Sequence, residues 1–85
     1  MTLPLTPQVL AAAYDFLNAT EPFCRWNLPD SEDIEFRVMS DRTACGWYWL
    51  NGGKHIIGVS RRLIGRTHSL VETMAHEMIH LHEAH

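Results

Sequence analysis

The most informative stretch of the chain is residues 69–81, SLVETMAHEMIHL. Ser69 followed by Glu72 matches a capping box, which predicts a helix that starts near Ser69 and runs toward the end of the chain. On a projection at about 100° per residue, the polar side of this helix carries Thr73, His76, His80 and Glu83, with Glu77 at its edge. The opposite side carries Leu70, Val71, Met74, Ala75, Met78 and Leu81. The pattern predicts an amphipathic helix with an apolar back for the core and a polar front.

The polar front contains His76-Glu77-Met78-Ile79-His80, which matches the HExxH pattern of zinc peptidases. Residues four apart on a helix lie on the same face, so both imidazoles can reach one ion. Glu77 borders that ion without ligating it, and its carboxylate can take a proton from a zinc-activated water. The sequence therefore predicts Zn²⁺ as the cofactor, His76 and His80 as metal ligands and Glu77 as the catalytic residue. The alternative for all three is a set of solvated surface side chains.

The N-terminal part of the chain predicts one helix followed by a loop. Thr6 can cap the helix and Pro7 suits its first position. Leu10, Ala13, Tyr14 and Leu17 recur at helical spacing. Pro22 should stop this helix, and residues 22–32 are rich in proline and polar side chains. We therefore expect a loop there.

The middle of the chain predicts three strands, at 34–39, 43–50 and 54–60, with a turn at Ser40-Asp41-Arg42. Asn51-Gly52-Gly53 is a strong hairpin signal, because these residues tolerate positive φ. Trp47-Tyr48-Trp49 places large rings on both faces of the second strand. One face should pack under a helix, and the other is either ordinary packing or part of a substrate groove. The expected fold is α+β: an N-terminal helix, a three-stranded antiparallel meander and a C-terminal HExxH helix.

Composition limits the class of protein. The 85 residues allow one domain at most, and a metal often stabilises a domain this small. No apolar run approaches the ~18 residues that span a bilayer, and the N-terminus lacks the pattern of a signal peptide. We therefore expect a cytoplasmic protein with no membrane partner. The two cysteines, Cys24 and Cys45, are expected to be free and packed.

The stretch from Glu72 to Leu81 resembles the active-site helix of SprT-like zinc metallopeptidases. In that family a helix, a small antiparallel sheet and the HExxH helix follow one another in the order expected here. The resemblance implies a zincin fold in which an edge strand cradles an extended substrate. It also implies zinc ligation by His76 and His80 and catalysis by Glu77.

A catalytic zinc usually has three protein ligands, and the third is not evident. In SprT-like enzymes it lies beyond the HExxH helix. His85 is a candidate, although a continuing helix would turn it to the face opposite His76. Glu83 lies on the correct face. We expect residues 1–85 to be a zincin-like domain that is incomplete at its C-terminus, with weak zinc binding.

Three functional hypotheses follow. The first is a zinc-dependent metallopeptidase that acts on a protein or peptide substrate through a zinc-activated water. The second is a catalytically inactive zincin-fold module for binding or regulation. The third, a nucleic-acid adaptor that uses Arg61, Arg62 and Arg66, has little support from a net charge of −3. The sequence leaves the substrate, the cleavage preference and the oligomeric state open.

Overall fold

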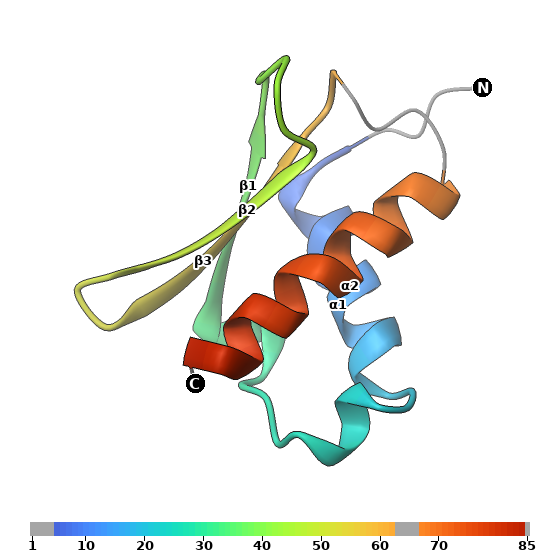
Figure 1. Ribbon diagram of the computed structural model, residues 1–85, viewed down its shortest axis with the longest axis vertical. Helices are drawn as coiled ribbons and strands as arrows, with labels where there is room; N and C mark the ends of the chain where they lie inside the picture. Colours follow the sequence, from blue (N-terminus) through green and yellow to red (C-terminus); the bar gives the residue numbers. More distant parts are fainter. Residues whose placement is uncertain (1–4, 63–66, 85) are drawn as a thin grey trace.

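A computed structural model describes residues 5–62 and 67–84, which form two helices and a three-stranded sheet. The elements follow in the order α1 (Pro7–Asn18), β1 (Ile34–Met39), β2 (Gly46–Asn51), β3 (Lys54–Ser60) and α2 (Thr67–Ala84). Both helices lie on the same side of the sheet, where α1 packs on β1 and α2 packs on β2 (Figure 1). The predicted α+β class is confirmed.

Helix α1 begins where the sequence predicts. The Thr6 hydroxyl accepts a hydrogen bond from the Val9 amide at 3.1 Å, and Pro7 occupies the first turn. Leu10, Tyr14 and Leu17 are buried against the sheet and α2. The following loop contains two 3₁₀ turns, at Phe23–Arg25 and Ser31–Asp33. Phe23 and Leu28 from this loop complete the core, so the predicted loop is a packed connection.

The predicted antiparallel meander is wrong, because the sheet is mixed. Its strand order is β1-β3-β2, with β1 parallel and β2 antiparallel to the central strand β3. The physical reason lies in β3, where all residues from 56 to 60 are buried. A strand that is apolar on both faces belongs at the centre of a sheet, where both of its edges are also hydrogen-bonded.

Residues 40–45 carry the chain past β3 instead of forming a tight turn. The Asp41 carboxylate accepts hydrogen bonds from the Thr43 and Ala44 amides at 2.6 and 3.2 Å. The Ser60 amide then donates to the Cys45 carbonyl at 2.8 Å. These contacts fix the crossing connection to the end of β3. Consequently β2 begins at Gly46, three residues later than predicted.

The hairpin predicted at Asn51-Gly52-Gly53 is confirmed. Gly52 and Gly53 have φ angles of +58° and +83°, a region that glycine enters without a Cβ penalty. Asn51 pairs with Lys54 across this two-residue loop. The hairpin projects beyond the helical layer (Figure 1). Because β2 is a terminal strand in the order β1-β3-β2, its outer edge is not paired with another strand among the described residues.

The three adjacent rings of β2 alternate between the two faces of the sheet, as predicted. Tyr48 packs against the core under the helices, and its hydroxyl lies 2.7 Å from His55 Nδ1. Trp47 and Trp49 lie on the opposite face, where both rings approach Gly58. The Arg37 guanidinium lies 5.5 Å from the centre of the Trp49 ring.

Two smaller expectations need correction. Helix α2 begins at Thr67, so its predicted start near Ser69 is two residues late, and the capping-box contacts involve side chains outside the described set. Cys24 and Cys45 are free, as predicted, but both are exposed and not packed. No helix in residues 5–62 or 67–84 combines the length and the apolar character needed to cross a membrane.

Candidate metal centre

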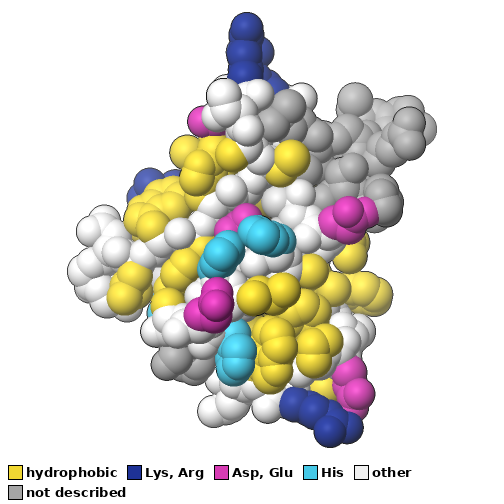
Figure 2. Space-filling model, viewed as in Figure 1, with side chains coloured by type: hydrophobic (Ala, Val, Ile, Leu, Met, Phe, Trp, Pro, Cys, Tyr) yellow, Lys and Arg dark blue, Asp and Glu magenta, His cyan; other side chains and the backbone are white. Residues whose placement is uncertain are grey.

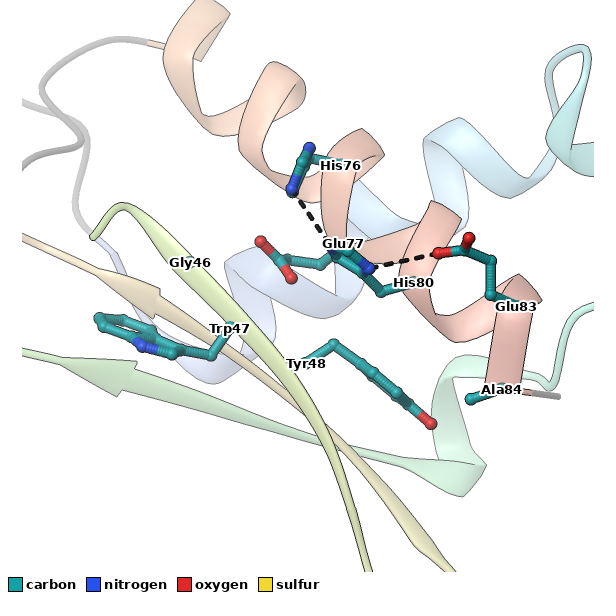
Figure 3. Close-up of a pocket in the computed structure, with 8 residues that line it drawn as sticks. All are labelled: Gly46, Trp47, Tyr48, His76, Glu77, His80, Glu83 and Ala84. Carbon is teal, nitrogen blue, oxygen red and sulfur yellow. Dashed lines mark hydrogen bonds and ion pairs between the residues drawn. The ribbon is translucent and has the colours of Figure 1, made fainter.

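Helix α2 divides into a buried back and an open front, as its sequence predicts. Leu70, Met74, Met78 and Leu81 are buried in the core. The front faces a hollow of about 460 Å³ between α2 and the first half of β2. The hollow is lined by Gly46, Trp47, Tyr48, His76, Glu77, His80, Glu83 and Ala84 (Figure 3). The three residues of the predicted site therefore share one cavity.

The two predicted metal ligands converge. His80 Nε2 lies 3.1 Å from His76 Nε2, and the ring centres are 4.8 Å apart. Two Zn–N bonds of ~2.0–2.1 Å in a tetrahedral site would hold their nitrogens roughly 3.3–3.4 Å apart. The observed separation, at which the two rings share a hydrogen bond, is slightly shorter, so the rings would move apart slightly to bind one zinc ion. Both side chains are exposed, and Figure 2 shows histidine side chains beside acidic ones at the surface of the molecule.

Glu77 is the buried member of the site, with 4% of its surface exposed. It lines the hollow and also a second one of about 390 Å³, which lies on the other side of Gly46. Burial raises the pKa of the Glu77 carboxyl above its usual value, and the nearby His76 and His80 imidazoles oppose part of that rise. A raised pKa suits a general base, because such a group works best when its pKa approaches the operating pH.

The raised pKa of Glu77 has a consequence for stability. When the pKa of a carboxyl group is higher in the folded state than in the unfolded state, its protonated form stabilises the fold. This contribution is complete below the pKa of the unfolded state and is lost as pH rises through the pKa of the folded state. We therefore expect metal-free Glu77→Gln to match wild type in acid. At neutral pH the variant should be more stable than wild type, because it does not bury a charged carboxylate. Urea unfolding across a pH series, with a chelator present, measures this difference.

Asp41→Asn provides a control of opposite sign. Hydrogen bonds from the Thr43 side chain and backbone hold the pKa of Asp41 below its usual value. The charged Asp41 carboxylate therefore stabilises the fold above the pKa of the unfolded state, and this contribution is lost as pH falls through the lower pKa of the folded state. Asp41→Asn should therefore destabilise the protein at neutral pH and have little effect in acid. A Glu77→Gln difference that did not change with pH would contradict the account of Glu77.

Gly46 brings the backbone of β2 against the site. A Cβ at this position would lie 2.6 Å from Thr73 Cγ2 and 3.0 Å from Glu77 Oε2. Real Cβ atoms do not approach other atoms so closely, so any larger residue must displace the helix or the carboxylate. Sequence reasoning missed this residue. The one available signal was a glycine directly before the aromatic run of a strand, which often marks a close backbone approach.

Gly46→Ala is expected to destabilise the fold by about 1–3 kcal/mol, as overpacking usually does. The measurement is the urea midpoint of the purified variant. Adding Thr73→Ser removes the Cγ2 methyl from the tightest contact and should restore part of the loss. An alanine variant as stable as wild type would mean that the close approach of β2 to α2 is not maintained in solution.

The described residues do not place a third ligand beside the Nε2 atoms of His76 and His80. The Glu83 carboxylate lies 3.3 Å from His80 Nδ1, the ring nitrogen that faces away from His76 (Figure 3). His85 lies outside the described residues. Within the described part of the chain, no group of three or more His, Cys, Asp or Glu side chains is arranged to hold a metal ion. The described site thus offers two protein ligands.

Comparisons with known proteins give no relative: no family model, curated protein or solved structure matches the chain.

Proposed function

We propose that the chain is a zinc-dependent metallopeptidase of the SprT-like, zincin type. The observation that carries the proposal is the convergence of two imidazole nitrogens, 3.1 Å apart, beside a buried carboxylate. Helical spacing brings the two imidazoles together, and the buried carboxylate that lines the same hollow distinguishes the site from a pair of solvated histidines. The HExxH spacing and the amphipathic helix support the same conclusion.

His76 and His80 would hold the ion through their Nε2 atoms. When bound, Zn²⁺ supplies Lewis acidity toward a carbonyl and lowers the pKa of a water molecule. Glu77 does not ligate the metal in this mechanism. Its carboxylate accepts a proton from the attacking water and passes it to the leaving amine. Burial raises the pKa of this carboxyl group, so the carboxylate accepts a proton more readily.

The free edge of β2 supports an extended peptide as the substrate. The hydrogen bond between Ser60 and Cys45 fixes which residues of β2 bond to β3. In an antiparallel pair these residues alternate, so the amides and carbonyls of Gly46, Tyr48 and Leu50 point away from β3. Gly46 and Tyr48 also line the hollow beside His76 and Glu77. An extended peptide added to this edge would pass the catalytic carboxylate.

A paired assay tests the proposal. Zinc affinity is measured by competition with a chromogenic chelator, and cleavage is measured on an unfolded protein substrate with and without excess chelator. We expect chelator-sensitive cleavage by the zinc-loaded protein and loss of both zinc binding and cleavage in His76→Ala. His82→Ala is the matched control, because His82 lies on the same helix but stacks on Trp26 at 4.2 Å, outside the hollow. Cleavage that survives in His76→Ala would refute the assigned metal site.

A second candidate is a zincin-fold binding module without turnover. The two-ligand site among the described residues favours it, because catalytic zinc usually has three protein ligands. A protein that binds zinc and unfolded chains but never cleaves them would support this function over the first.

A further inference from the structure

The carboxylate of Glu83 lies on the far side of the His80 ring from the other histidine. His80 Nδ1 is 3.3 Å from Glu83 Oε1, whereas His80 Nε2 is 3.1 Å from His76 Nε2 (Figure 3). The ring of His80 thus lies between a carboxylate on one nitrogen and the candidate metal position on the other. Glu83 is three residues after His80 on α2, a spacing at which side chains of a helix meet.

This geometry favours one of the two tautomers of a neutral His80. Neutral imidazole has one N–H donor and one lone pair. A carboxylate can only accept, so its position beside Nδ1 favours the tautomer with the proton on Nδ1. His80 Nε2 then carries the lone pair, which accepts a hydrogen bond from the His76 Nε2–H in the metal-free protein and is the donor atom available to a metal ion. Glu83 does not need to reach the metal to affect its binding.

We infer that Glu83 is a positioning residue of the metal centre, which fixes the tautomer and orientation of His80, and is not itself a ligand. The inference rests on the proposed metal site. Outer carboxylates of this kind typically contribute 10–100-fold to metal affinity. The Glu83 side chain is 67% exposed, which places its expected contribution near the lower end of that range. The residue three positions after His76 is Ile79, so α2 gives His76 no carboxylate at the equivalent position.

The first test needs no metal. Long-range nitrogen-15 NMR of the metal-free protein, at a pH where His80 is neutral, reports which ring nitrogen carries the proton. We expect the Nδ1–H tautomer of His80 in wild type and a shift toward Nε2–H in Glu83→Ala. Glu83→Gln keeps a neutral acceptor and should lie between the two. If the His80 tautomer is the same in wild type and Glu83→Ala, the inference is wrong.

The second test measures zinc affinity by chelator competition. Glu83→Ala should bind zinc about tenfold more weakly than wild type. Glu35→Ala is the control, because it removes the same charge from β1, outside the hollows that His76 lines, and should change affinity less than about twofold. An equal loss in both variants would reduce the role of Glu83 to general electrostatics and overturn the inference.

Cobalt substitution separates a positioning role from direct ligation. The visible spectrum of bound Co²⁺ depends on the number and type of its ligands. Wild type and Glu83→Ala should give the same spectral shape at saturation, because the ligand set is unchanged. A changed spectrum would make Glu83 a ligand and contradict the inference. If wild type binds neither zinc nor cobalt, the proposed metal site fails, while the tautomer measurement still decides whether Glu83 orients His80.

Discussion

Glu77→Gln is expected to lower peptide hydrolysis by about 10²–10⁴-fold, the usual contribution of a general base, while zinc remains bound, because Glu77 is not a metal ligand in the proposed mechanism. The amide of Gln is nearly the same size as the carboxylate, so the buried position beside Gly46 stays filled. It cannot accept a proton from water. The two imidazoles that face each other at 3.1 Å are untouched. Catalysis and metal binding should therefore separate at this residue.

The measurement pairs zinc titration with cleavage of an unfolded substrate at saturating zinc. Glu35→Gln is a suitable control, because this carboxylate lies on β1 beside Arg37 and outside the hollow. It should cleave at the wild-type rate. Full activity in Glu77→Gln would refute the mechanism even with zinc bound. No activity in wild type, with zinc bound normally, would favour the binding module instead.

Much of the candidate site could be predicted from the sequence because it lies on one helix. The angular positions of His76, Glu77 and His80 follow from 3.6 residues per turn and need no knowledge of tertiary contacts. The structure brings the two imidazoles together as the spacing predicts. The buried back of α2, with Met74 and Met78 in the core, follows from the same periodicity.

The parts that could not be predicted depend on contacts between distant segments. Alternation within 34–39 identifies a strand but does not say which edge of the sheet it joins or in which direction. The short connection suggested a hairpin, whereas residues 40–45 cross the end of β3. The unbroken run Ile56-Ile57-Gly58-Val59 was the available signal for a central strand, because it leaves no polar face for solvent.

Gly46 and Glu83 show the same limit at the level of single residues. The role of Gly46 depends on how closely β2 approaches α2, which is a tertiary distance. Glu83 was predicted to lie on the ligand face, and it does, but its position on the face did not reveal which nitrogen of His80 it meets. Helical spacing predicts the side of the helix on which Glu83 lies. It does not predict whether the carboxylate meets His80 Nδ1 or a metal ion, because these positions differ by only a few ångströms.

Leu81→Ala should destabilise the protein more than any surface change on α2, by about 3 kcal/mol within the usual 2–5 kcal/mol range for such substitutions. Leu81 is fully buried in the core between the helices and the sheet. A domain of 85 residues has a total stability of roughly 4–13 kcal/mol, so this one truncation removes a large part of it. The urea midpoint and the thermal midpoint of the metal-free protein measure the loss.

Ile79→Ala is the matched control, because Ile79 and Leu81 flank His80 on the same helix and carry the same number of carbon atoms. Ile79 is 44% exposed and Leu81 is not exposed. Ile79→Ala should therefore cost less than about 1 kcal/mol. Zinc should stabilise both variants, because a ligand that binds only the folded state adds to its stability by mass action. Equal losses from the two substitutions would mean that α2 does not bury the face opposite the histidines, and the orientation of His76 and His80 toward β2 would then lose its structural basis.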